Sequence, residues 1–215
     1  LIFGLLLGIR HAFEPDHLVA VSTMLTNQKS PFRAAKIGAF WGMGHTSSLF
    51  VVGLLTLLFR VRIPEYIARN LEGLVGIMLI ILGVRSIIQR SGNSTHSHEH
   101  SHGETTHDHT HEHRKHMHIH RHKQSFLMGS IHGLAGSGAL LILVLSTISS
   151  VMIGILYILI FGVGSIIGMS MMTLLLGIPF ASSMKRFAQA EQILRITIGA
   201  LSCIFGAVIV YRTFV

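Results

Sequence analysis

Long apolar runs alternate with short polar connections along most of the 215-residue chain. Six of these runs reach the roughly 20 residues that a helix needs to cross a bilayer. They lie at about 1–25, 34–59, 67–89, 124–147, 151–180 and 190–214. Their apolar positions follow no amphipathic period, as expected for helices surrounded by lipid and by each other. The pattern therefore predicts an all-α polytopic membrane protein with six transmembrane helices.

The composition agrees with this pattern and narrows the class of protein. Half of the residues are hydrophobic, 12% are charged and the mean hydropathy is +0.59, which is typical of a membrane protein. The formal net charge of +8 comes from basic residues at the ends of apolar segments, so it does not indicate nucleic-acid binding. The single cysteine, Cys203, lies in an apolar run, which excludes a disulfide framework and a thiolate metal site.

One stretch, residues 91–123, interrupts the apolar pattern. It holds twelve of the sixteen histidines among Ser, Thr, acidic and a few basic residues, a composition typical of a disordered, metal-binding linker. The linker divides the chain into two halves of three apolar runs each, residues 1–90 and 124–215. Its predicted accessory metal ligands are His96, His98, His100, His102, His107, His109, His111, His113, His116, His118, His120 and His122.

The two halves resemble each other weakly. His11 matches His132 at an offset of 121 residues, and glycines at 42 and 44 match those at 162 and 164 at an offset of 120. Glycines at 76 and 83 match those at 199 and 206 at an offset of 123. Because each half has an odd number of spans, the second half would enter the membrane from the opposite face. The expected architecture is two inverted three-helix repeats, with a binding site at the midplane where they meet.

Lys and Arg residues are distributed unevenly between the two faces of this predicted bundle. The first, third and fifth connections carry most of them, whereas the fourth carries none. Cytoplasmic loops are enriched in Lys and Arg. The odd connections, including the His-rich linker, are therefore predicted to be cytoplasmic, and both termini to be outside.

The four histidines outside the linker all fall inside apolar segments. His11 and His17 flank the centre of the first segment, His45 lies near the centre of the second, and His132 lies shortly before the centre of the fourth. An ionisable side chain at the bilayer centre costs at least about 2.5–3.5 kcal/mol. Imidazoles, with the carboxylate of Asp16, are ligands for divalent transition metals. We predict a metal site of His11, Asp16, His17 and His45; ordinary interhelical hydrogen bonding is the alternative.

Pro15 lies inside the richest part of this set. On a regular helix His11 would point about 140° away from Asp16 and about 120° away from His17. Pro15 removes a backbone donor and biases Glu14 away from helical geometry. The first helix is therefore predicted to break at Pro15, so that the three side chains converge. An ordinary proline kink is the alternative.

Further residues are expected to bind the metal or to orient its ligands. Glu14 is a candidate ligand, orienting partner or proton acceptor, and Ser137 stands at the repeat position of Asp16. The full set of these additional candidates is Glu14, His132, Thr46 and Ser137.

Glu72 and Arg195 fall at equivalent positions of the third and sixth segments. We predict that they form an ion pair that holds the two halves together. In the alternative, each lies near a membrane interface and extends separately to the headgroups.

Three motifs resemble one known family. The segment Arg-His-Ala-Phe-Glu-Pro-Asp-His-Leu at 10–18 is similar to the signature of the nickel/cobalt transporter family, and Phe-Trp-Gly-Met-Gly-His-Thr at 40–46 to its second motif. The segment Ser-Ile-His-Gly-Leu-Ala-Gly-Ser at 130–137 is similar to its urease-accessory branch. Two features depart from the family. Many members have eight spans, and Gly-Leu-Ala-Gly-Ser-Gly at 133–138 replaces an acidic motif of larger members.

This resemblance implies uptake of Ni²⁺, with Co²⁺ as a second candidate, by secondary transport across the plasma membrane of a bacterium. It implies that His11, Asp16 and His17 are essential and that His45 lies close by. The implied partners are the cytoplasmic nickel chaperones of urease or hydrogenase maturation. Related six-span proteins with His-rich loops include nickel exporters, so efflux stays open as an alternative.

The same residues bear on other possible functions. Nickel, cobalt and zinc suit imidazole and carboxylate ligands alike, which leaves a zinc transporter as an alternative. A membrane metalloprotease is not indicated, because no His-Glu-x-x-His string lies in an apolar segment. No ATP-binding motif is present. The chain is therefore predicted to be a cofactor-free secondary transporter rather than an enzyme, with a metal ion and the lipid bilayer as partners.

Overall fold

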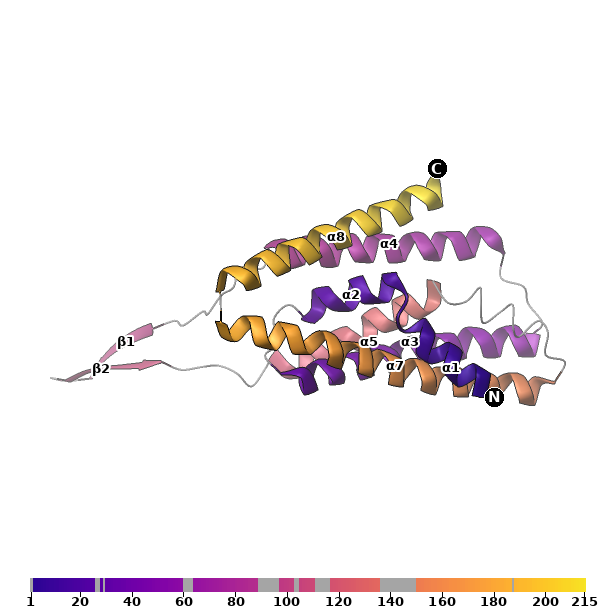
Figure 1. Ribbon diagram of the computed structural model, residues 1–215, viewed down its shortest axis with the longest axis horizontal. Coiled ribbons are helices and arrows are strands. Elements are labelled where there is room, and N and C mark those ends of the chain that lie inside the picture. The colour runs from indigo at the N-terminus through magenta and orange to yellow at the C-terminus, as the bar shows by residue number, and fades with distance from the viewer. Residues whose placement is uncertain are drawn as a thin grey trace.

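A computed structural model of the protein describes residues 2–25, 28, 30–59, 64–88, 97–102, 105–110, 117–135, 150–186 and 188–215. Within these ranges the chain forms long helices and one β-hairpin (Figure 1). The elements are α1 (Ile2–His11), α2 (Pro15–Leu25), α3 (Pro31–Phe59), α4 (Glu65–Ile88), β1 (Ser97–His102), β2 (Thr105–Thr110), α5 (Met117–Ala135), α7 (Val151–Arg186) and α8 (Ala188–Phe214).

Four of the described helices are long and apolar enough to cross a membrane. These spans are Pro31–Phe59, Glu65–Ile88, Val151–Pro179 and Gln192–Phe214. Large apolar side chains on their outer surfaces, such as Leu55, Ile81, Val163 and Ile204, are at least half exposed. Exposed apolar surface on this scale marks a contact with lipid or with another apolar surface. The prediction of a helical membrane protein is confirmed at this level.

The first apolar segment is two short helices rather than one. Helix α1 ends at His11, and α2 begins at Pro15. Between them, the amide of Glu14 donates to the carbonyl of His11 at 3.1 Å, and Leu18 N donates to Glu14 O at 3.0 Å. Pro15 takes the first position of α2, where its missing N–H has no helical partner to lose. The predicted break at Pro15 is confirmed.

The fourth apolar segment and the linker differ from their predicted boundaries. Helix α5 begins at Met117 instead of 124, and the residues from 136 to 149 lie outside the described part of the chain. Within the predicted disordered linker, β1 and β2 pair antiparallel, with His98 opposite His109 and His100 opposite His107. The disorder of the linker stays a prediction.

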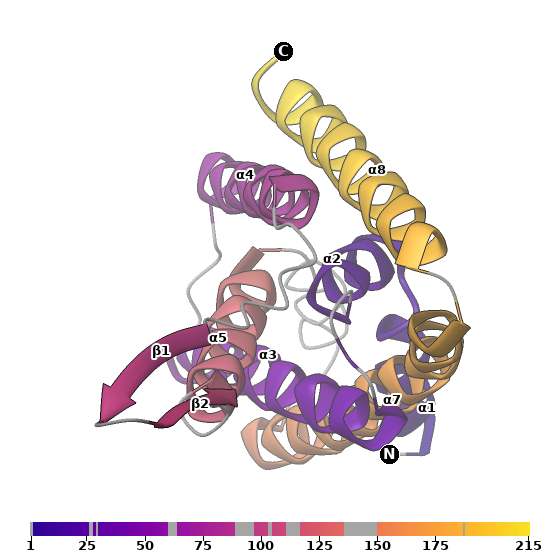
Figure 2. The same cartoon turned by 90° about the vertical axis from the view of Figure 1, so that its left-hand side faces the viewer.

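The helices form two groups with α2 between them (Figure 2). One group is α4 with α8, and the other is α1, α3, α5 and α7. Helices α4 and α8 pack against each other, α3 packs against both α7 and α5, and α1 packs against α7. Helix α2 contacts α4, α7 and α8. The start of α1 and the end of α8 lie at one end of the bundle, and the β-hairpin projects from the opposite end (Figure 1). The prediction that the linker is cytoplasmic and both termini are outside stays a prediction.

Glycines allow the helices to approach at backbone distance, and these contacts occur in matching pairs. A Cβ added at Gly44 of α3 would collide with the carbonyl oxygen of Phe126 in α5. A Cβ added at Gly164 of α7 would collide in the same way with Leu5 in α1. Likewise, added side chains at Gly42 and Gly162 would meet Ile166 and Thr46. Small residues at such contacts are the usual basis of helix association in lipid.

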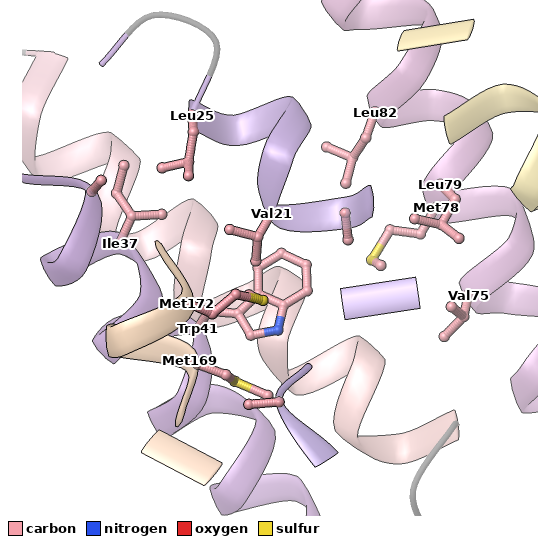
Figure 3. Packing of buried hydrophobic residues seen from close by; sticks show 13 residues of the cluster. Val21, Leu25, Ile37, Trp41, Val75, Met78, Leu79, Leu82, Met169 and Met172 are labelled. Atoms are coloured by element: carbon pink, nitrogen blue, oxygen red, sulfur yellow. The ribbon is translucent and has the colours of Figure 1, made fainter. Parts of the chain in front are cut away.

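Helix α2 connects the two groups through the main core (Figure 3). Val21 of α2 lies among the fully buried Trp41 of α3, Met172 of α7 and the inward face of α4, which includes Leu79. Lipid tails are as apolar as these side chains, so close van der Waals packing rather than release from water holds such a core in a membrane. Helix α2 is thereby fixed with its first turn at the centre of the bundle.

The predicted ion pair between Glu72 and Arg195 is wrong. The hydroxyl of Ser86 in α4 donates to the backbone oxygen of Arg195 in α8 at 3.3 Å. Glu72 is exposed and lies nearly four helical turns, about 21 Å, from Ser86 along α4. Arg195 is only 4% exposed, and its Nε and Nη1 atoms have no hydrogen-bond partner in the described structure.

Candidate metal centre

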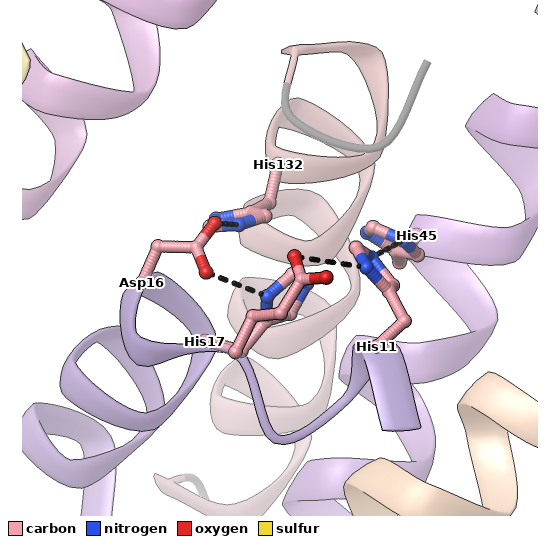
Figure 4. Close-up of polar contacts among 6 residues, drawn as sticks. His11, Asp16, His17, His45 and His132 are labelled. Atoms are coloured by element: carbon pink, nitrogen blue, oxygen red, sulfur yellow. Dashed lines mark hydrogen bonds and ion pairs between the residues drawn. The ribbon is translucent and has the colours of Figure 1, made fainter. Parts of the chain in front are cut away.

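Four helices bring the predicted ligands together in the middle of the bundle (Figure 4). His11 is the last residue of α1, and Asp16 and His17 lie in the first turn of α2. His45 lies midway along α3, and His132 lies in the last described turn of α5. All four imidazoles are buried, with exposed fractions of 0–3%. The break before Pro15 makes this convergence possible, because it turns α2 away from the axis of α1.

Three imidazoles form one compact set. The Nε2 atoms of His11 and His45 are 3.2 Å apart, and the ring of His17 lies 4.6 Å from that of His11 and 5.2 Å from that of His45. Each of the three offers a nitrogen within 4.8 Å of the others. Two nitrogens bound to one metal at about 2.0–2.1 Å lie about 2.9–3.4 Å apart for bond angles between square and tetrahedral. The His11–His45 separation falls in that range.

Asp16 joins two of the helices through its two oxygens. Its Oδ1 lies 3.1 Å from Nδ1 of His17, and its Oδ2 lies 2.8 Å from Nε2 of His132. An ionised carboxylate accepts hydrogen bonds, so these nitrogens donate and carry the ring protons. Nε2 of His17 is then left with its lone pair, and it has no hydrogen-bond partner in the described structure. Asp16 therefore orients His17 for binding through Nε2, as carboxylates commonly do for metal-binding histidines.

Glu14 has a similar relationship to His11. Its Oε2 lies 3.0 Å from Nδ1 of His11, as an ion-pair contact that is bent away from ideal hydrogen-bond geometry. The Glu14 side chain is 40% exposed. A negative charge at this point favours a proton on Nδ1 of His11, which directs the lone pair of Nε2 toward His45.

The ends of the helices add to the field at this centre. The last carbonyl groups of α1 point toward the turn that follows His11, and the C-terminal end of a helix carries a partial negative charge. Asp16 lies in the first turn of α2, where a carboxylate is favoured by the positive end of the helix. Half-helices that end inside a membrane protein are common ion-binding elements. The arrangement is suited to a cation that binds nitrogen ligands.

The remaining predicted residues fall elsewhere. The hydroxyl of Thr46 donates to the carbonyl of Gly162 at 3.2 Å, so it joins α3 to α7. Ser137 lies outside the described residues. Of the linker histidines, five lie on the hairpin and three in the first turns of α5, whereas His96, His111, His113 and His116 lie outside the described ranges. The contacts of His122 include the ring of Phe40, with the ring centres 4.5 Å apart.

Three residues around the centre were not predicted from the sequence. The ring of Trp41 lies 5.8 Å from that of His132, and the ring of Phe161 lies 5.7 Å from that of His11. Ser165 is fully buried, and its hydroxyl has no hydrogen-bond partner among the described residues. Trp41 could have been found, since it is the only tryptophan of the chain and lies one helical turn before His45.

These features define the class of the protein: a helical membrane protein with a buried imidazole–carboxylate centre. Residues 19–208 match the family described as "Cytochrome C biogenesis protein transmembrane region", and the chain belongs to this family.

Individual relatives are also known. The chain is 39% identical over 212 residues to "Urease accessory protein UreH" of Bacillus sp. (strain TB-90), an alignment that covers 99% of this chain and 90% of that protein. It is 27% identical to "Chloroplast protein FOR GROWTH AND FERTILITY 1" and 26% identical to "Chloroplast protein FOR GROWTH AND FERTILITY 2", both of Arabidopsis thaliana. Those alignments cover 81% of this chain and 48% and 46% of the plant proteins. No solved structure matches the chain.

Proposed function

We propose that the protein is a secondary transporter that takes up Ni²⁺, with Co²⁺ as a second candidate substrate, across the plasma membrane. The observation that carries this proposal is the set of three buried imidazoles at the centre of the bundle. In particular, the Nε2 atoms of His11 and His45 face each other at 3.2 Å. Buried imidazoles oriented by carboxylates are ligands for late first-row divalent metals.

The preference for nickel rests on the relatives as well as on the ligands. A relative with 39% identity over nearly the whole chain is named as a urease accessory protein, and supply of nickel fits that name. The motif around His11 and His17 resembles the nickel/cobalt transporter signature. Zinc accepts the same ligands, and export would use the same centre. Zinc transport and efflux are therefore the alternatives that the experiment must separate.

The proposed transport cycle uses two inverted three-helix repeats. Reciprocal glycine contacts support this architecture, because Gly44 against Phe126 and Gly164 against Leu5 are the same contact after exchange of the two halves. The packing of α1 on α7 likewise corresponds to that of α5 on α3. Rocking of one repeat against the other would open the centre to each side in turn.

The His-rich linker is the proposed cytoplasmic acceptor. The proposed orientation in the membrane places the hairpin end of the bundle in the cytoplasm and both termini outside, in agreement with the Lys and Arg distribution along the sequence. Histidines of β1 and β2 would buffer arriving metal and pass it to cytoplasmic nickel chaperones of urease or hydrogenase maturation.

A role in thiol chemistry is less well supported by the residues. The family description refers to cytochrome c biogenesis, and c-type haem is attached through paired cysteines. This chain has one cysteine, Cys203. Its thiol therefore has no second thiol in this sequence with which to form a disulfide. Instead, it donates to the backbone oxygen of Ile80 at 3.7 Å within the packed α4–α8 pair.

Accumulation of radioactive nickel, cobalt and zinc in cells that express the wild type or His11→Ala tests the proposal. Higher cellular nickel with the wild type, lost in His11→Ala, is the expected result. Thr56→Ala, which removes a hydroxyl that donates to Val52 O within α3, is the control and should behave as the wild type. Lower cellular nickel would mean export, zinc alone would mean a zinc transporter, and no change for any metal would refute the transport function.

A further inference from the structure

The buried centre contains a second set of ligands beside the three imidazoles. Asp16, His17 and His132 also place one ligand atom each within 4.8 Å of one another. The ring centres of His17 and His132 are 4.1 Å apart, whereas those of His45 and His132 are 6.1 Å apart. His17 is thus the member common to both sets, and His132 lies nearer to His17 than to His45.

The two sets are attached to different parts of the bundle. His11 ends α1, which starts at the end of the bundle that holds both termini, and His132 lies in the last described turn of α5, which starts near the opposite end (Figure 1). Two helices that start at opposite ends of the bundle therefore each deliver one histidine to the centre. His17, at the start of α2, lies between them (Figure 4).

We propose that a transported ion occupies two positions in turn. In the first position it is held by His11, His17 and His45, and in the second by Asp16, His17 and His132. This inference rests on the proposed transport function and concerns the path of the ion within it. Because both positions need His17, only one ion occupies the centre at a time, and transfer proceeds by exchange of ligands around His17.

The ring nitrogens of His17 make this exchange possible. In the first position Nε2 binds the ion while Nδ1–H donates to Asp16. In the second position His17 still binds the ion through Nε2, which has no partner in the described structure. His132 binds it through its buried Nδ1, which is unpartnered among the described residues and keeps its lone pair because Nε2–H donates to Asp16. No ring proton has to move in the transfer.

Three variants of the full-length protein separate the two positions. His45→Ala removes a ligand of the first position, whereas His132→Ala and His132→Gln remove a ligand of the second. The glutamine variant keeps an N–H donor for Asp16 but loses the imidazole. Nickel affinity is measured on purified protein by competition with a chromophoric chelator, the number of bound imidazoles by X-ray absorption, and transport by nickel uptake into proteoliposomes.

We expect His45→Ala to weaken nickel binding by more than about tenfold, since even outer partners of a metal site contribute about 10–100-fold. Both His132 variants should bind nickel within a small factor of the wild type, with three imidazoles, yet lose most uptake. Weakening of binding by His132→Gln to the level of His45→Ala would overturn the inference in favour of one four-histidine centre. Normal uptake by His132→Gln would also overturn it, because His132 would then only orient Asp16. Failure of the wild type to bind or transport nickel would instead refute the proposed function itself.

Discussion

His11 and His45 are 34 residues apart in the chain, and their Nε2 atoms are 3.2 Å apart in the structure. The Glu14 carboxylate beside Nδ1 of His11 favours the tautomer that presents a lone pair to His45. A cation between the rings can use the lone pairs of both nitrogens, whereas without a cation one nitrogen must donate a proton to the other. The break between α1 and α2 and the packing of α3 thus bring two imidazole nitrogens to a separation that suits a shared metal ion as well as a hydrogen bond.

Nickel should stabilise the folded protein through this position. A ligand that binds only the folded state adds about 2.7 kcal/mol to the free energy of unfolding at 100 times its dissociation constant. We expect a nickel-dependent rise of the unfolding temperature of the purified protein, reversed by a chelator and absent in His11→Ala. Thr56→Ala is the control, because the bond of that hydroxyl in the described part of the chain is a donation to Val52 O in its own helix. An equal rise in His11→Ala would place the bound metal elsewhere, on the linker for example.

Glu14 should affect affinity without being a ligand. Glu14→Gln keeps the size of the side chain but removes the charge that lies 3.0 Å from Nδ1 of His11. We expect nickel affinity to fall by about tenfold, the lower end of the effect of outer carboxylates, because the side chain is partly exposed. The number of imidazoles on the metal, measured by X-ray absorption, should not change. Glu65→Gln is the matched control, since Glu65 is 90% exposed and, within the described ranges, pairs with Arg69 alone. A change in the first coordination shell would show that Glu14 binds the metal directly.

The proposed repeat predicts equal effects at two distant glycines. Gly44→Ala and Gly164→Ala would each force a Cβ against a backbone carbonyl oxygen, of Phe126 and Leu5 respectively. Each should reduce the free energy of unfolding by about 1–3 kcal/mol, as overpacking does elsewhere. Gly4→Ala, whose new Cβ would meet only the edge of the Tyr157 ring, should cost less. Unfolding in mixed micelles measures all three, and a large difference between the first two would speak against equivalent halves.

The sequence allowed the convergence of the candidate ligands to be predicted because their surroundings are apolar. His11, His17 and His45 stood out as ionisable groups inside membrane-length segments, and Pro15 indicated where the helix would break. The division of roles between Asp16 and the imidazoles could not be predicted. It depends on ångström-scale distances across the turn at residues 12–14, which no periodicity encodes.

The error at Glu72 and Arg195 has a geometric reason. Equivalent residues of inverted repeats touch each other only where they lie near the symmetry axis. Ser202 and Leu79 are such a pair, joined by a hydrogen bond of 2.8 Å. Glu72 lies about two turns from Leu79 along α4, and Arg195 lies about two turns from Ser202 along α8. Because α4 and α8 are antiparallel, those two displacements point in opposite directions, and the charges end up far apart.

Arg195 should therefore destabilise the fold rather than hold its halves together. Its Nε and Nη1 are buried without partners among the described residues, and an unsatisfied buried polar group costs about 1–3 kcal/mol, with more for a charge. We expect Arg195→Met to raise the free energy of unfolding, and Arg69→Met, at an exposed ion pair, to leave it nearly unchanged. A double-mutant cycle with Glu72→Gln should be additive within about 0.5 kcal/mol. A coupling energy above that value would show that Glu72 and Arg195 do interact as an ion pair.

The β-hairpin should be dispensable for transport. Ser97 and Thr110 are paired across β1 and β2, and paired residues of antiparallel strands have Cα atoms about 4.5–5.5 Å apart. Deletion of residues 97–110 therefore leaves chain ends that can be joined with little strain, and it keeps α5 and the stacking of His122 on Phe40. We expect nickel uptake within about twofold of the wild type at high external nickel, because the central ligands His11, His17 and His45 are untouched and a linker that only buffers metal can be bypassed. A full-length variant with serine in place of the five hairpin histidines separates loss of ligands from loss of length. Complete loss of uptake in both variants would show that the hairpin lies on the transport path, and loss only in the deletion would show that its length matters.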